Sequence, residues 1–238
     1  MQKTVLITGG TSGIGQALAE AYLARGARVA VCGRSQEALD RFSRKNPGAL
    51  AIQADVTSGT ARTAMLDAVA RTFGQLDILI NNAGTFVERD FTRADATQGL
   101  DEEVALNLTG PIELTHEVLT RWPSPEAIVF VTSGFALVSP KHAPTYGAVK
   151  AGLHAFADRM RMQLASRGTH VLELLPPMVD TPMNAGREGK KMTTEAVAEI
   201  TLKALERRRD VALPGEVAML PLLLRLAPGI AKAIVANR

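Results

Sequence analysis

Seven short apolar runs recur along the chain, and longer amphipathic segments separate them. The runs lie at residues 4–8, 28–32, 49–53, 76–81, 127–132, 169–175 and 210–213. Several of them do not alternate with polar residues, which is typical of strands that are buried on both faces. The intervening segments have helical periodicity and lie at 12–26, 35–45, 59–73, about 97–122, 146–167 and 193–208. This alternation predicts an α/β fold with a doubly wound parallel β-sheet of about seven strands flanked by helices.

The length of 238 residues suits one large α/β domain or two small ones. No linker, internal repeat or low-complexity segment divides the chain, so we expect one domain over residues 1–238. The net charge of +3 comes without an extended Lys/Arg run. This charge distribution argues against nucleic-acid binding and suits an anionic ligand.

The single cysteine, Cys32, lies in an apolar run, so no intrachain disulfide can form. We therefore expect a reduced, cytoplasmic setting. Because the first predicted strand follows the initial methionine closely, we expect no signal peptide, and because no run reaches about 18 apolar residues, we expect no membrane span.

A glycine-rich turn, "TGGTSGIG" (8–15), joins the first predicted strand to the first predicted helix. Glycines let the backbone approach an anion, and the start of a helix offers free N–H groups and a positive dipole end. A P-loop is disfavoured because Gln16 and Ala17 occupy the positions where it needs Lys and Ser/Thr. The turn therefore indicates phosphate binding without phosphoryl transfer, although its G-x-x-x-G-x-G spacing differs from the G-x-G-x-x-G of dinucleotide sites. A glycine turn without a ligand is the alternative.

Five features in order along the chain resemble the short-chain dehydrogenases/reductases. They are "TGGTSGIG", "NNAG" (81–84), Asn107, Ser133 and the pair Tyr146 and Lys150. The resemblance runs from residue 3 to about residue 183. It implies a Rossmann-type domain with a seven-stranded sheet and an NAD(P)-dependent enzyme that interconverts a ketone or aldehyde and an alcohol by hydride transfer. We expect no metal.

Tyr146 and Lys150 are four residues apart in a predicted helix, so they project from nearly the same face. An ammonium beside a phenol favours the phenolate and lowers the pKa of the phenol. The resemblance implies that Tyr146 is the general acid/base and that Lys150 also bonds the nicotinamide ribose. It implies that Ser133 orients the substrate oxygen and that Asn107 holds a water linking Lys150 to solvent.

The resemblance also implies a set of cofactor-binding residues. Asp55 would contact the adenine, although an acid at the start of a helix is the simpler interpretation. The family usually has Pro-Gly after the sixth strand, but this chain has Pro177 where the glycine would be, within "LPPMVDTPM" (175–183). The implied residues are Gly9, Thr11, Ser12, Gly13, Ile14, Asp55, Val56, Asn82, Ala83, Gly84, Tyr146, Lys150, Pro176, Val179 and Thr181.

The residues after the second strand indicate which cofactor is used. Sites specific for NAD place an acid there, which bonds the ribose 2′-hydroxyl. This chain has Gly33 and Arg34 at that point and no acid before Glu37. A guanidinium can bind a 2′-phosphate through paired hydrogen bonds, whereas a carboxylate would repel it. We therefore expect NADP(H) to be preferred, with NAD(H) possible. The alternative for Arg34 is a solvated loop arginine.

The family layout places several apolar residues near the substrate: Phe86, Phe135, Ala136, Leu137, Met178 and Met183. They indicate a small apolar carbonyl or alcohol substrate, although core packing explains any one of them equally well. The substrate loop is expected at about 178–195. Its basic residues Arg187, Lys190 and Lys191 could attract an acidic substrate, but we expect them to be solvated.

Three further expectations concern alternatives and partners. A non-catalytic dinucleotide sensor on the same fold would tolerate loss of Tyr146 or Lys150, and both are present.

The helix from Tyr146 has apolar residues on a second face, assigned to Ala157 and Met162, so we expect a homodimer or homotetramer. The apolar segment 217–236 is interrupted by prolines and cations. Packing against the substrate loop or a neighbouring subunit is favoured over an interfacial membrane contact.

Overall fold

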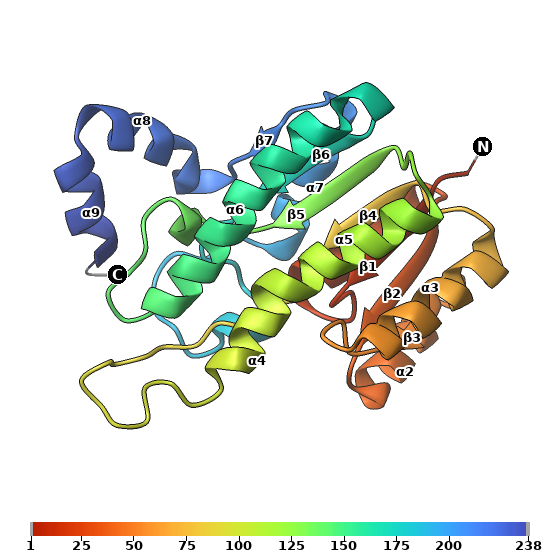
Figure 1. Ribbon diagram of the computed structural model, residues 1–238, viewed down its shortest axis with the longest axis horizontal. Coiled ribbons are helices and arrows are strands. Elements are labelled where there is room, and N and C mark those ends of the chain that lie inside the picture. Colours follow the sequence, from red (N-terminus) through yellow and green to blue (C-terminus); the bar gives the residue numbers. More distant parts are fainter. Residues whose placement is uncertain (1, 237–238) are drawn as a thin grey trace.

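A seven-stranded parallel sheet forms the centre of the protein in the computed structural model, which describes residues 2–236 (Figure 1). The strand order is β3-β2-β1-β4-β5-β6-β7, and every neighbouring pair is parallel. The predicted α/β fold is therefore confirmed. The strands are β1 Thr4–Thr8, β2 Arg28–Gly33, β3 Leu50–Gln53, β4 Ile78–Asn81, β5 Ala127–Val131, β6 His170–Leu174 and β7 Val211–Ala212.

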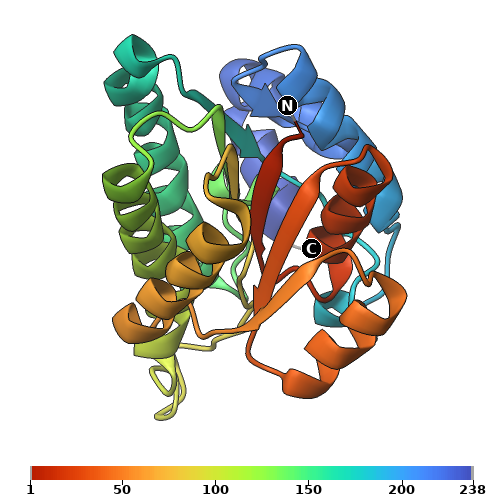
Figure 2. The ribbon, with the colours of Figure 1, turned by 90° about the vertical axis from the view of Figure 1, so that its right-hand side faces the viewer.

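Helices cover both faces of the sheet (Figure 2). One layer contains α1, α2 and α7, and the other contains α3, α5 and α6. The main helices are α1 Gly13–Ala24, α2 Gln36–Lys45, α3 Gly59–Phe73, α4 Leu100–Val104, α5 Gly110–Arg121, α6 Pro144–Leu164 and α7 Thr194–Glu206.

Strand β1 shows why the apolar runs do not alternate with polar residues. Val5 and Ile7 pack in the cluster with α1 and α7, while Leu6 between them packs in the cluster with α3 and α5. None of the three has any exposed surface. A strand covered on both sides needs apolar residues at successive positions, as the sequence predicts.

The region expected to be one long helix, about 97–122, is interrupted. Helix α4 is followed by one turn of π-helix, Ala105–Thr109, and α5 begins at Gly110. Pro111 has no N–H for the carbonyl four residues before it, and its ring would crowd that carbonyl. A wider turn relieves this conflict, and such turns are frequent at functional sites. The turn contains Asn107, whose side chain is fully buried.

The C-terminal segment forms a helical hairpin at the edge of the molecule (Figure 1). A 3-10 turn at Gly215–Met219 leads into α8, Leu220–Leu226, and then into α9, Pro228–Ala236. We call residues 217–236 the C-terminal hairpin. Within residues 2–236 no helix has both the length and the apolar character that crossing a membrane requires.

Candidate active site

A cavity of about 870 Å³ opens at the carboxyl ends of the central strands. It lies where the chain order of the sheet reverses, between β1 and β4, so the loops after these strands diverge. In open parallel sheets, ligands bind in the crevice at this point. The loops after β1, β4, β5 and β6 all contribute to the lining, together with α6 and the C-terminal hairpin.

The glycine-rich turn has the shape that a phosphate cradle needs. Gly9 and Gly13 have positive φ angles of 63° and 53°, which favour glycine. A Cβ on Gly15 would lie 2.4 Å from the carbonyl oxygen of Gly9, so no other residue fits there. Ser12 caps α1 without a side-chain hydrogen bond, which leaves the first N–H groups of the helix available at the cavity. These residues therefore fit the diphosphate of a dinucleotide.

Tyr146, Ser133 and Lys150 converge at the floor of the cavity. Ser133 accepts a hydrogen bond from the backbone N–H of Phe135 over 3.1 Å, and its own hydroxyl pairs with Tyr146. The ammonium of Lys150 lies 5.7 Å from the centroid of the Tyr146 ring and donates to the carbonyl of Val131 over 3.1 Å. The structure thus brings together the predicted catalytic residues of α6 and Ser133, which follows β5.

Burial dominates the electrostatics of this group. Burial is the largest effect on the pKa of Tyr146, and the Glu103 carboxylate also raises it. The Ser133 hydrogen bond and Arg187 act in the opposite direction, and the resulting pKa is about 12. Burial also lowers the pKa of Lys150 to about 8. The lowered phenol pKa that the sequence suggested is not seen, because the loss of solvent around Tyr146 outweighs its neighbours. At neutral pH, Tyr146 is a protonated phenol and can donate.

Asn107 is held by the loop after β4. Its amide nitrogen donates to the carbonyl of Thr85 over 3.0 Å, and its oxygen accepts from the N–H of Thr85 over 3.2 Å. A Cβ on Gly84 would lie 2.7 Å from the Asn107 oxygen and 3.5 Å from the Lys150 nitrogen. Asn107 and Lys150 therefore face each other across Gly84, without a direct hydrogen bond between them among the contacts of the described chain.

A buried ion pair supports the first turn of α6. Arg89 pairs with Glu103 over 3.1 Å, and the hydroxyl of Thr145 donates to the same carboxylate over 2.7 Å. Neither charged side chain has appreciable exposure. Because Thr145 precedes Tyr146, the pair fixes the loop after β4, helix α4 and the start of α6 relative to one another.

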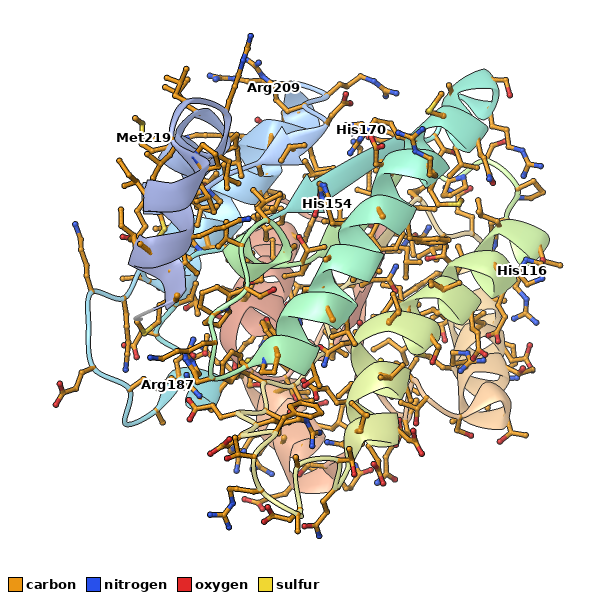
Figure 3. The ribbon with its side chains drawn as sticks, turned by 60° about the vertical axis from the view of Figure 1, so that its left-hand side comes forward. His116, His154, His170, Arg187, Arg209 and Met219 are labelled. Atoms are coloured by element: carbon orange, nitrogen blue, oxygen red, sulfur yellow. The ribbon has the colours of Figure 1, made fainter. Side chains whose placement is uncertain are left out.

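A second buried carboxylate lies behind Ser133. Glu173 on β6 accepts from the hydroxyl of Thr132 over 2.6 Å, and its other oxygen pairs with Nδ1 of His154 over 2.8 Å. His154 follows Lys150 by one turn of α6 and points toward the strands (Figure 3). The carboxylate thus connects β5, β6 and α6 at the residue next to Ser133.

Aromatic side chains form one wall of the cavity. The ring of Phe86 lies 4.7 Å from that of Tyr146 and 6.3 Å from that of Phe135, between centroids. The guanidinium of Arg187 stacks on the ring of Phe86, 4.1 Å from its centroid. Arg187 also pairs with Glu88 over 2.7 Å. The expectation that Arg187 is solvated is therefore wrong: a stacked ring and a carboxylate partner hold it against the cavity.

Most of the expected cofactor residues line the cavity, but four lie outside it. Thr11, Arg34, Asp55 and Val56 are absent from the lining and follow β1, β2 and β3, at the end of the crevice expected for the adenine. Burial raises the pKa of Asp55, but two hydrogen bonds from Thr57 and the charge of Arg34 hold it below its ordinary value. The lining residues are Gly9, Ser12, Gly13, Ile14, Asn82, Ala83, Gly84, Tyr146, Lys150, Pro176, Val179 and Thr181.

The loop containing Pro177 still reaches the phosphate turn. Val179 forms a bridge with Met192, and a Cβ on Gly13 would lie 3.0 Å from the methyl group of Thr181. The peptide bonds of the described residues are all trans, so Pro177 requires no unusual isomer.

The substrate side of the cavity is mostly apolar. Phe86, Phe135, Met178 and Met183 line it as expected, whereas Ala136 and Leu137 do not. Sequence reasoning missed the part played by the C-terminal hairpin, although it allowed for packing near the substrate loop. The hairpin residues at the cavity are Val217, Met219, Leu220, Leu223, Ile234 and Val235.

Comparisons with known proteins agree with this geometry. A family model described as short chain dehydrogenase matches residues 3–192. The chain is 38% identical over 194 residues to the uncharacterized oxidoreductase DltE of Bacillus subtilis, covering 80% of this chain and 77% of that protein. It is 31% identical to the uncharacterized oxidoreductase SERP2049 of Staphylococcus epidermidis, over 92% of this chain and 97% of the relative.

Two similar solved structures contain a bound dinucleotide. A short-chain dehydrogenase from Sphingobium yanoikuyae in complex with NADPH has a TM-score of 0.81 and 28% identity, over 97% of this chain and 95% of that one. A point variant of actinorhodin polyketide ketoreductase with NADPH has a TM-score of 0.79 and 26% identity, over 91% of this chain and 92% of that one.

Proposed function

Because this chain belongs to the short-chain dehydrogenase family, we propose that it interconverts a ketone or aldehyde and an alcohol, with NADP(H) as the preferred cofactor. The observation that carries the proposal is the convergence of Ser133, Tyr146 and Lys150 beside a glycine turn built for a diphosphate.

In the direction of reduction, the residues of the chain supply position and a proton. A dinucleotide held by these residues would supply the hydride that the carbonyl carbon accepts. The Ser133 hydroxyl and the Tyr146 phenol are the two O–H groups that orient the carbonyl oxygen. As the C=O π bond breaks, this oxygen takes the proton of Tyr146, and in oxidation the phenolate takes it back. The aromatic wall and the hairpin exclude water from the reacting atoms.

Lys150 stabilises the phenolate that this step leaves behind. Its pKa of about 8 keeps it mostly charged at neutral pH, while it lies near enough to neutrality to exchange a proton. Arg187, stacked on Phe86, adds a second positive charge that favours the phenolate. Asn107, across Gly84 from Lys150, is where we expect the water that connects the lysine to solvent.

The preference for NADP(H) rests on Arg34. Its side chain is exposed directly after β2, and no acid follows the strand before Glu37. Gly33 lies beside Thr11, with only 3.3 Å between the Thr11 hydroxyl and a Cβ placed on Gly33. A 2′-phosphate would reach the guanidinium and the Thr11 and Ser12 hydroxyls. Loss of the arginine contact should cost about 1.5–3 kcal/mol, or roughly 10- to 150-fold in affinity.

Titration of NADPH and NADH into the native protein and into Arg34→Ala tests the cofactor proposal. The variant should bind NADPH much more weakly and NADH nearly as before. Arg44→Ala, another arginine of the same β2–α2 region, is the control. A native preference for NADH, or equal weakening of both cofactors, contradicts the proposal.

The apolar cavity supports a small apolar carbonyl compound as substrate. A panel of ketones and aldehydes, followed by the loss of NADPH absorbance, would identify the class. Tyr146→Phe should bind NADPH normally and lose turnover, because only the proton donor is removed. Near-native turnover in this variant would refute the assigned role. NADPH binding without turnover on any substrate would favour the dinucleotide-sensing alternative.

We also propose a cytoplasmic homodimer or homotetramer. The cysteine supports the reduced setting, since Cys32 is free and buried. The second face assigned to α6 needs correction, because Ala157 is fully buried against the sheet and only Met162 is exposed. Pairing through α6 would therefore centre on Met162.

A further inference from the structure

The C-terminal hairpin carries an exposed apolar face in addition to its buried one. Nine large hydrophobic side chains of the described residues are exposed, and five of them lie on this hairpin. They are Met219, Leu222, Leu226, Ile230 and Ile234. Contiguous exposed apolar patches mark interaction surfaces, whereas scattered ones need no explanation.

The spacing of these residues follows the helices. Along the turn into α8 the exposed residues are at 219, 222 and 226, while on α9 they are at 230 and 234. Residues three or four apart lie on one helical face. On α9, Ala231 and Val235 form a neighbouring row that is buried. Helix α9 therefore has one row of side chains packed inward and a second apolar row directed outward, whereas α8 has no buried side chain and exposes Leu222 and Leu226.

The charges of the hairpin have one sign. Arg225 and Lys232 are exposed, and no Asp or Glu occurs between residues 217 and 236. A two-fold contact between copies of this face would place the cations of both copies in one interface, without an acid of the hairpin to compensate them. An apolar face with cations at its edge instead matches an anionic bilayer surface, where the acyl region takes the side chains and the headgroups attract the charges.

The apolar face continues into the mouth of the cavity. Met219 and Ile234 are both exposed and line the cavity, as does Met183 on the substrate loop. Met219 lies on the outer edge of the hairpin, on the same side of the molecule as Arg187 (Figure 3). Charged groups at this mouth include Lys190, Glu188 and Glu216. A surface covering the hairpin would therefore also adjoin the opening to the site.

We propose that the C-terminal hairpin docks on an anionic lipid bilayer and lies in its interface, with Leu222, Leu226 and Ile230 immersed. The site then opens beside the lipid, from which an apolar substrate can enter. The docking rests on the surface of the hairpin alone and does not depend on the proposed reaction.

Co-sedimentation with vesicles tests the docking without any turnover. The full chain is mixed with phosphatidylcholine vesicles that contain none or 30% phosphatidylglycerol, at low and high salt. The native protein should bind the anionic vesicles, and less so at high salt. Leu226→Glu and Ile230→Glu, which do not line the cavity, should each lower the partition coefficient at least tenfold. The double variant Arg225→Gln, Lys232→Gln should lose on the order of tenfold on anionic vesicles only.

Phe91→Glu is the matched control, because Phe91 is exposed to a similar extent on a loop away from the hairpin. It should bind as the native protein does, and unchanged melting temperatures show that the variants are folded. Absence of native binding overturns the proposal, and so does an equal loss in Phe91→Glu. If vesicles do not bind and Leu226→Glu instead dissociates an oligomer in light scattering, the face is a contact between subunits and the proposal is wrong.

Discussion

Replacing the catalytic lysine should stabilise the protein. The pKa of a lysine in solution is about 10.4, and burial lowers that of Lys150 to about 8. At ~1.4 kcal/mol for each tenfold change in the protonation equilibrium, keeping this ammonium charged inside the fold costs about 3 kcal/mol at pH 7. In Lys150→Met an apolar side chain of similar length removes that cost, but also the hydrogen bond to Val131, worth about 1 kcal/mol. The net gain should be about 2 kcal/mol.

The gain should depend on pH in a defined direction. Between pH 8 and 10.4 the unfolded chain binds the proton of this lysine and the folded chain does not, so the native protein gains stability as pH rises. The advantage of Lys150→Met should therefore be largest at pH 7 and fall by about 2 kcal/mol by pH 9.5. The other buried groups with shifted pKa values, including Tyr146, are present in both proteins and cancel in the difference.

Urea unfolding of the cofactor-free proteins at pH 7 and pH 9.5 measures this difference. Lys203→Met is the control, because Lys203 is an exposed lysine in an i,i+4 pair with Glu199 and should change stability by less than about 0.5 kcal/mol at either pH. A Lys150→Met protein that is less stable than the native one at pH 7, or a difference independent of pH, would refute the reasoning. If Lys150→Met is more stable but inactive, the buried charge of Lys150 destabilises the protein and is retained because activity requires it.

Three other outcomes are expected. Gly15→Ala should abolish dinucleotide binding and lower the free energy of unfolding by about 1–3 kcal/mol in thermal unfolding, because its methyl group would lie 2.4 Å from the Gly9 carbonyl oxygen. Gly229→Ala is the control and should be neutral, because a Cβ there meets no atom within 4 Å. Normal dinucleotide binding by Gly15→Ala would contradict the role of the turn as a phosphate cradle. Glu173→Ala should lower the free energy of unfolding by about 3–5 kcal/mol, because the Thr132 hydroxyl loses its charged partner and a void remains. A decrease below about 1 kcal/mol would mean that the buried carboxylate does not stabilise the fold. Light scattering at micromolar concentration should show a dimer or tetramer, and a monomer would exclude the proposed assembly.

The sheet could be predicted because burial on both faces leaves a local signal. Val5, Leu6 and Ile7 must all be apolar if successive residues face different helical layers, and a short window of sequence contains that information. Boundaries were less accurate. Helix α6 begins at Pro144 and not at Tyr146, because a proline fits the first turn, where its missing N–H is not needed. The π-helical turn at Ala105–Thr109 was not expected, since the amphipathic pattern continues through it.

The catalytic side chains could be placed by motif and order, whereas the residues that surround them could not. The pairing of Arg187 with Glu88 joins residues that are far apart in the chain, and nothing local distinguishes Arg187 from a solvated loop cation. The same holds for Glu103, whose charge acts on Tyr146 from another helix. The hairpin is apolar on both of its faces, so its composition did not indicate which residues would line the cavity.

The environment of Cys32 gives this protein a practical property. The thiol has no exposed surface, and burial raises its pKa to about 12, so it holds almost no reactive thiolate near neutrality. Because the sequence contains no other cysteine, an exposed one introduced by mutation would be the only site that maleimide dyes or spin labels modify. Single-cysteine reporters can therefore be placed on any loop or helix of the native chain without first removing a background thiol.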